Sequence, residues 1–240
     1  MRPAHSRLCV ALLPLLSLLG CATQRPETAE AGAVVEPQKP PRQFEHKATN
    51  EDSLGTLPEG IGLPVGALAP DAQVTSSDGA PISLSSLYAE GPILLVFYRG
   101  GWCPFCNFQI RELTEAYGDF RARGVRPVAI SVDRIEEAAR TDATYEIPFP
   151  LLSDPDLSAH NAFHVLNTMD EKTIRRLSLM GLDVESYSGQ DHHTVAIPAL
   201  FVISESGTLL WTHADHDYKT RPTIEQLLGA IESLGLSGIQ

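Results

Sequence analysis

The hydrophobic pattern of this chain predicts an alternation of buried strands and amphipathic helices between residues 64 and 235. Residues 93–98 and 125–132 are apolar runs without polar alternation, which is typical of central strands covered on both faces. Residues 105–123 carry apolar side chains at close to helical spacing, and Gly124 ends this predicted helix. Alternating strands and helices indicate a parallel core. Further helices are predicted over residues 135–145, 157–165, 171–180 and 223–234.

Two predicted hairpins add antiparallel strands to this core. They lie within residues 72–84 and 199–212, each centred on a Gly-containing turn. A βαβ unit followed by a ββα unit is the arrangement of the thioredoxin fold. We therefore predict an α/β protein of thioredoxin-like fold, with a central mixed sheet flanked by helices. An N-terminal β-hairpin precedes the core, and a polar insert around residues 181–190 precedes the strand that begins at Pro198.

The N-terminal quarter of the chain does not follow this pattern. A positively charged start and an apolar run over residues 8–19 predict a signal peptide over residues 1–20, because the run is too short to span a membrane. Residues 21–63 are rich in Pro, Glu, Ala and Gln, so we predict a disordered tether there. The domain is expected over residues 64–240.

The predicted signal peptide ends in Leu18-Leu19-Gly20-Cys21, which resembles the bacterial lipobox. This resemblance implies cleavage before Cys21 and lipidation of that cysteine. We therefore expect a lipid-anchored protein of the cell envelope, on the outer membrane or the periplasmic face if two membranes are present. The alternative is an ordinary cleaved signal in which Cys21 has no role.

Charge and cysteine content narrow the function classes. The formal net charge of −12 argues against a nucleic-acid partner, because a polyanion would be repelled. Of the 4 cysteines, Cys9 belongs to the signal and Cys21 to the lipobox. Cys103 and Cys106 alone remain in the domain, so this is not a disulfide-stapled scaffold.

Those two cysteines follow a predicted strand and a Gly100-Gly101 turn, and they precede a predicted helix. This is the arrangement of a redox-active dithiol. Cys103 is expected to be the nucleophile, because it lies directly before the positive end of the helix. Cys106 is expected to be the resolving thiol. The alternative is half of a zinc site, but the second cysteine pair that such a site needs is missing.

The stretch Phe97-Tyr-Arg-Gly-Gly-Trp-Cys-Pro-Phe-Cys-Asn-Phe-Gln-Ile-Arg-Glu-Leu113 resembles the peroxiredoxin-like branch of the alkyl hydroperoxide reductase C and thiol-specific antioxidant (AhpC/TSA) family. Residues 149–156, 197–203 and 213–221 resemble the same branch, so the resemblance covers most of residues 64–235. It implies thiol redox chemistry that needs no cofactor besides a Cys103–Cys106 disulfide.

The resemblance also implies substrate contacts. In thioredoxin-like proteins the position of Pro198 holds a cis-proline that faces the dithiol and leaves a backbone edge free for an extended substrate. Ile197 and Pro198 are therefore candidate substrate-binding residues, together with Trp102, Gly101 and Arg99. The glycines are expected to let a partner's backbone approach. The alternatives are a strand-initiating trans-proline and a tryptophan that merely shields the sulfurs.

One departure from peroxiredoxins divides the functional predictions. Laid on the peroxiredoxin motif Pro-x-x-x-Thr-x-x-Cys, Arg99 falls at the proline, Cys103 at the threonine and Cys106 at the peroxidatic cysteine. Pro198 falls near the family's peroxide-polarising arginine. We therefore predict a thiol-disulfide oxidoreductase acting on protein or small-molecule thiols and disulfides. The alternative is a thiol-dependent hydroperoxide reductase, with Cys106 as nucleophile.

A third hypothesis is a copper carrier in which His192 or His193 joins the two cysteines. We favour partly solvated loop histidines and expect no metal site. His213, His216 and Asp217 are assigned to an exposed turn.

Overall fold

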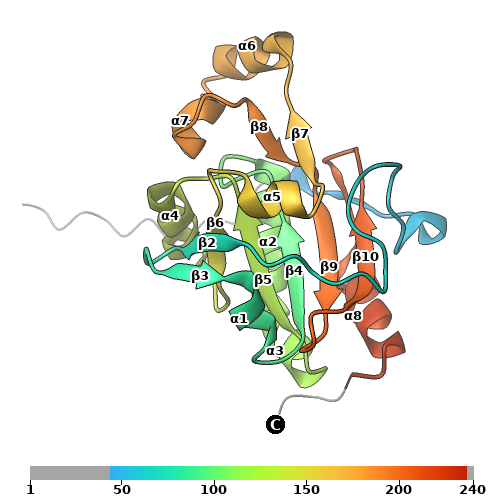
Figure 1. Cartoon of the computed structure of the whole chain (residues 1–240). Helices are drawn as coiled ribbons and strands as arrows, with labels where there is room; N and C mark the ends of the chain where they lie inside the picture. Colours follow the sequence, from blue (N-terminus) through green and yellow to red (C-terminus); the bar gives the residue numbers. More distant parts are fainter. Residues whose placement is uncertain (1–43, 237–240) are drawn as a thin grey trace, which may run out of the picture. The chain divides into compact units, whose positions relative to one another are not determined.

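A seven-stranded mixed sheet forms the centre of the computed structural model, which describes residues 44–236 (Figure 1). Its strand order is β10-β9-β4-β5-β6-β2-β3. Strands β4, β5 and β6 are mutually parallel, whereas β9, β10, β2 and β3 join antiparallel. This confirms the predicted α/β fold with a mixed sheet. The strand bounds are Gln73–Ser76 (β2), Pro81–Ser83 (β3), Ile93–Phe97 (β4), Arg126–Ser131 (β5), Leu151–Ser153 (β6), Ala199–Ile203 (β9) and Leu209–Ala214 (β10).

The core lies on both faces of this sheet, and β4 shows why its sequence is continuously apolar. All five of its residues are buried. Alternate side chains point to opposite faces of a strand, so Leu94 and Val96 join one apolar cluster whereas Leu95 and Phe97 join the other. Helices α2, α3, α4 and α8 contribute to the first cluster, and α1 and α5 to the second.

The helices follow the predicted positions with one break. The single helix predicted over residues 105–123 is two helices, because Ala116 leaves the helical conformation with φ −93° and ψ 7°. Helix α8 begins with a capping box between Thr223 and Gln226. The helix bounds are Leu84–Tyr88 (α1), Pro104–Glu115 (α2), Tyr117–Ala122 (α3), Ile135–Tyr145 (α4), Ser158–Ala162 (α5) and Ile224–Ser233 (α8).

The insert before Pro198 is longer and more regular than its polar sequence suggested. It is bracketed by an antiparallel pair of strands, β7 (Leu166–Thr168) and β8 (Thr194–Ala196). Between them lie α6 (Glu171–Leu179) and the short α7 (Val184–Ser188). The range expected to be irregular thus contains a helix, which Asp183 caps by accepting a hydrogen bond from the Ser186 backbone.

Part of the predicted tether belongs to the domain. Residues 44–63 contain β1 (Lys47–Ala48) and the short helix η2 (Glu51–Ser53). Strand β1 pairs in parallel with β11 (Thr220–Arg221). The composition of residues 44–63 did not predict this structure, because backbone pairing and a few apolar contacts hold the segment in place. The predicted signal peptide, Cys21 and the tether up to residue 43 lie outside the described residues. Within residues 44–236, no helix has the length and apolar character needed to span a bilayer.

Candidate active site

The turn between β4 and α2 places both cysteines in the interior of the domain. Gly100 has φ +138°, a conformation that side chains other than glycine rarely adopt. Cys103 is the N-cap of α2, and Pro104 follows at its first helical position. Both thiols are free, and Cys103 and Cys106 are only 1% and 0% exposed. The expected strand, glycine turn and dithiol at a helix start are therefore present.

Cys106 is the thiol that this environment activates. Its complete burial would by itself raise its pKa. A hydrogen bond from the Cys103 thiol, the Arg221 guanidinium and the Arg99 backbone amide oppose burial and lower the pKa of Cys106 to about 6. Arg221 Nη2 lies 3.8 Å from the Cys106 sulfur. These contacts favour the thiolate of Cys106, the form that attacks peroxides and disulfides.

Cys103 has the opposite electrostatics. Its hydrogen bond to the Cys106 sulfur and its burial raise the pKa of Cys103 well above its usual range. The side chain of this N-cap residue makes no capping hydrogen bond to the helix. Its place before α2 was the reason to expect it as nucleophile. The pKa directions instead favour Cys106 as the nucleophilic thiolate and Cys103 as its hydrogen-bond donor.

Arg221 is a candidate site residue that sequence reasoning missed. Its side chain is 1% exposed and donates to the Gln109 amide oxygen at 3.1 Å, which fixes the guanidinium beside α2. The sequence suggested that the fixed cation of peroxiredoxins had been replaced by Pro198. A fixed cation is present, but it comes from β11 rather than from the strand after Pro198. Arg221 ends a stretch that resembles the family, which was the only sequence signal for it.

Arg99 places a second cationic side chain near the dithiol. Its guanidinium carbon lies 4.2 Å from the Tyr218 ring centroid and 4.9 Å from the Trp102 ring centroid. Its Nη2 also contacts the sulfur of Met169 at 3.9 Å. Trp102 packs towards the Tyr187 ring of the insert. Arg99 and Trp102 are 7% and 9% exposed, so both shield the turn from solvent.

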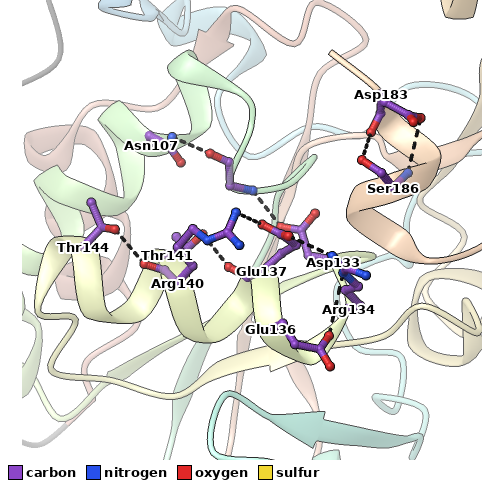
Figure 2. Close-up of polar contacts among 11 residues, drawn as sticks. Asn107, Asp133, Arg134, Glu136, Glu137, Arg140, Thr141, Thr144, Asp183 and Ser186 are labelled. Carbon is purple, nitrogen blue, oxygen red and sulfur yellow. Dashed lines mark hydrogen bonds and ion pairs between the residues drawn. The ribbon is translucent and has the colours of Figure 1, made fainter. Parts of the chain in front are cut away.

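The Gly100-Gly101 turn makes hydrogen bonds and close contacts with other residues of its own domain. The Gly101 N–H donates to Asp133 Oδ2 at 2.7 Å, and the Gly101 carbonyl accepts from Asn107 at 2.7 Å (Figure 2). A Cβ atom on Gly100 would lie 2.5 Å from Asp133 Oδ1. Burial raises the pKa of Asp133 to about 7. The glycines are needed for this internal contact, and the approach of a partner's backbone at Gly101 stays a prediction.

The predicted cis-proline is wrong, because no peptide bond among residues 44–236 is cis. Pro198 precedes β9 and initiates it, a position where the missing N–H has no ladder partner to lose. Its carbonyl accepts from the Asp215 N–H at 3.3 Å, and the Ile197 N–H donates to the Val165 carbonyl at 2.7 Å. The Ile197 N–H and the Pro198 carbonyl are therefore bonded within the domain, and substrate binding at these two residues stays a prediction.

The histidines do not join the cysteines. His192 Nε2 lies 3.1 Å from the Pro155 carbonyl, and His193 pairs with Glu185. His213 is buried in β10 rather than on an exposed turn, and burial lowers its pKa. No group of three or more His, Cys, Asp or Glu side chains within residues 44–236 is arranged to hold a metal ion. The structure thus offers the copper hypothesis no ligand set in the described part of the chain.

The fold is thioredoxin-like, and it carries a buried pair of free thiols at the start of α2. The sequence model of the AhpC/TSA family matches residues 65–212, which is more than half of the chain. The chain therefore belongs to the AhpC/TSA family.

Similar proteins bear the name peroxiredoxin. Peroxiredoxin 2 of Thermoplasma acidophilum is 31% identical over 117 residues, covering 46% of this chain and 58% of that protein. Chloroplastic peroxiredoxin Q of Sedum lineare is 32% identical over 89 residues, covering 37% and 47% of the two chains. The chain thus spans about half the length of these curated relatives.

Solved structures share the fold at low identity. Peroxidoxin BcpB of Mycobacterium tuberculosis superposes with a TM-score of 0.56 at 19% identity, covering 73% of this chain and 97% of that chain. Reduced Prx3 of Vibrio vulnificus in complex with hydrogen peroxide superposes with a TM-score of 0.58 at 14% identity, covering 70% and 99%. At these identities the likeness establishes the thioredoxin-like fold alone.

Proposed function

We propose that this chain is a thiol-dependent hydroperoxide reductase in which Cys106 attacks the peroxide and Cys103 resolves the product. The observation that carries this proposal is the Arg221 guanidinium, whose Nη2 lies 3.8 Å from the Cys106 sulfur and lowers the pKa of that thiol. Family membership and the similarity to peroxiredoxins support the choice of a peroxide as the oxidant. This is the alternative function from the sequence, now preferred to disulfide exchange.

The first step forms a sulfur–oxygen bond. The Cys106 thiolate attacks one peroxide oxygen, the O–O bond breaks, and the departing oxygen is protonated to water or an alcohol. Arg221 is the fixed cation beside the sulfur, where it can stabilise the charge that moves onto oxygen. Cys106 becomes a sulfenic acid. Since both sulfurs are buried, the peroxide reaches Cys106 only when the surrounding side chains open locally.

The second step forms a disulfide. The Cys103 sulfur attacks the Cys106 sulfenic sulfur, a sulfur–sulfur bond forms, and water leaves. The two residues lie one helical turn apart, at the start of α2. Two electrons from an external thiol reductant then restore both thiols.

Two serine variants of the full chain test this assignment. With dithiothreitol as reductant, Cys106→Ser should abolish hydrogen peroxide consumption. Cys103→Ser should still form a dimedone-reactive sulfenic acid at Cys106 in a single turnover, followed at the peptide level by mass spectrometry, but it should form no disulfide. Peroxide consumption that survives in Cys106→Ser and is lost in Cys103→Ser would reverse the roles of the two cysteines and overturn the assignment.

Thiol-disulfide exchange is the second candidate function. It is favoured by Cys103, a second thiol at the position where the peroxiredoxin motif has threonine. A protein that reduces insulin disulfides, yet reacts with hydrogen peroxide no faster than free cysteine does, would support this candidate and exclude the first.

We also propose that Cys21 carries lipid and holds the domain at the cell envelope. The lipobox-like sequence Leu18-Leu19-Gly20-Cys21 supports this proposal. In a bacterial host, Cys21→Ala should move the protein from the membrane fraction to the soluble fraction and abolish labelling by an alkyne fatty acid. An unchanged membrane fraction and unchanged labelling in this variant would contradict lipidation of Cys21.

A further inference from the structure

Arg221 lies on a strand with very little support of its own. Strand β11 has a single ladder partner within residues 44–236, the N-terminal strand β1. Ala48 is the register partner of Arg221. The Thr49 N–H donates to the Arg221 carbonyl at 2.9 Å, and the Lys47 N–H donates to the Lys219 carbonyl at 2.7 Å. The backbone of Arg221 is thus bonded directly to the segment around β1.

That segment, residues 44–49, is called the strap here, and it is fastened at both ends. At one end Gln226 of α8 donates to the Thr49 carbonyl at 2.8 Å. At the other end His46 Nε2 lies 2.6 Å from Glu112 Oε2, and the His46 ring packs edge-on against Phe108. Glu112 and Phe108 belong to α2, the helix that carries Cys106. The strap therefore links β11 to the helix of the reactive thiol.

Neither the strap nor Arg221 lies inside the span that the family model matches, residues 65–212. The dithiol turn lies wholly inside it. The cation that faces Cys106 and the strap that pairs with its strand therefore both lie outside the matched region, one on each side of it in the sequence.

We propose that the strap is a positioning element of the thiol site, which holds the Arg221 guanidinium against Cys106 by pairing with β11. The inference deepens the proposed function, because it concerns the same thiolate. A guanidinium stabilises a buried thiolate only while it is fixed nearby. If β11 loses its ladder partner, the side-chain bond to Gln109 must hold the guanidinium without the backbone pairing, so Arg221 is less firmly fixed and burial weighs more against the thiolate. The Cys106 thiolate then becomes less stable.

The experiment measures the pH midpoint of iodoacetamide alkylation at Cys106, followed at the peptide level by mass spectrometry. Thr49→Pro in the full chain removes the N–H that bonds the Arg221 carbonyl, and Arg221→Met removes the cation while keeping much of its volume. We expect the midpoint to rise from about 6 by at least about one unit in each variant. The matched control is Lys47→Ala, which removes only an exposed pair with Asp217 and should leave the midpoint unchanged.

The midpoint is the readout because a loosened strap also changes access to the sulfur, which alters the alkylation rate but not the pH at which the thiol ionises. The double variant Thr49→Pro/Arg221→Met should show the same midpoint as Arg221→Met alone. A further rise in the double variant would mean that the strap does not act through Arg221. An unchanged midpoint in a folded Thr49→Pro variant would overturn the proposal.

Gln226→Ala provides a second test if Thr49→Pro does not fold. It removes the side-chain hydrogen bond to the Thr49 carbonyl, together with the Gln226 contacts to the Thr223 N–H and to Glu51, and leaves the strap backbone intact. We expect the alkylation midpoint of Cys106 to rise in Gln226→Ala, by less than in Thr49→Pro. An unchanged midpoint would contradict the proposed role of the strap. Because alkylation needs no peroxide, this inference can fail while peroxide reduction stands. Equally, it can hold in a protein that reduces no peroxide.

Discussion

Two regions of the molecule meet at Cys106, and they are built differently. The β4–α2 turn is continuous in sequence and supplies both sulfurs. The β1–β11 pair supplies the cation, and Arg221 is 115 residues away from Cys106 along the chain. All five β4 residues are buried, whereas both β1 residues are exposed. The two sulfurs thus follow a fully buried strand, whereas the cation that faces Cys106 comes from a strand that pairs with the exposed β1.

This difference shows that the Cys-x-x-Cys motif determines where the thiols lie but does not determine which of them ionises. The motif places two thiols one helical turn apart, but the more stable thiolate is decided by the charges that reach them. Regions with few buried apolar contacts also open at lower free energy than core strands. The β1–β11 pair is therefore the part of the site where a small change can alter reactivity without unfolding the sheet.

The largest effect that we expect from the turn region is a change in the pH dependence of stability in Asp133→Asn. Burial raises the pKa of Asp133 from 3.8 to about 7. Between these pH values the folded protein holds a proton that the unfolded chain has lost, so the Asp133 contribution to stability falls as pH rises. The decline amounts to a few kcal/mol, at about 1.4 kcal/mol per pKa unit. Asparagine cannot ionise and still offers an oxygen to the Gly101 N–H, so the variant should lack this decline.

Urea unfolding of both proteins at several pH values between about 4 and about 7.5 measures this difference. Titrating groups far from Asp133 are common to both proteins and cancel in the comparison, whereas the charges of Cys106 and Glu137 act on Asp133 and belong to the measured difference. The unfolding free energy of Asp133→Asn minus that of the unsubstituted protein should increase steadily with pH. A difference that stays constant across this range would show that Asp133 is ionised in the folded protein.

The sequence predicted the turn region well because its determinants are local. Strand β4, the glycine turn and the start of α2 at Pro104 follow from an apolar run, a Gly-Gly pair and a proline in consecutive order. The predicted helix over residues 135–145 has the same bounds as α4. Continuous burial of β4 also follows from its lack of polar residues.

The second region could not be predicted because nothing local marks it. Strands β1 and β11 have two residues each, and their pairing joins the two ends of the domain. Composition alone assigned residues 44–63 to a tether, although Thr49 is only 3% exposed. The roles of the two thiols were predicted from the position of the helix start alone, because the sequence does not show that Arg221 lies beside Cys106. The cis-proline was inferred from the thioredoxin fold, which does not determine the isomer of this particular bond.

The smallest effect that we expect is that of His46→Ala in the strap. The substitution removes the 2.6 Å contact to Glu112 and the ring packing on Phe108, but it keeps the backbone ladder between β1 and β11. Glu112 is 30% exposed and can exchange its lost partner for water, so the loss of unfolding free energy should be about 1 kcal/mol. Urea unfolding measures this loss.

The alkylation midpoint of Cys106 completes the comparison between the two regions. Because the ladder still holds Arg221 in His46→Ala, the midpoint should rise less than in Thr49→Pro, and the Lys47→Ala control should show no rise. A rise in His46→Ala equal to that in Thr49→Pro would show that the contact with α2, and not the β1–β11 pairing, fixes the guanidinium. The cation would then depend on the helix that carries Cys106, and the division of the site into two regions would fail.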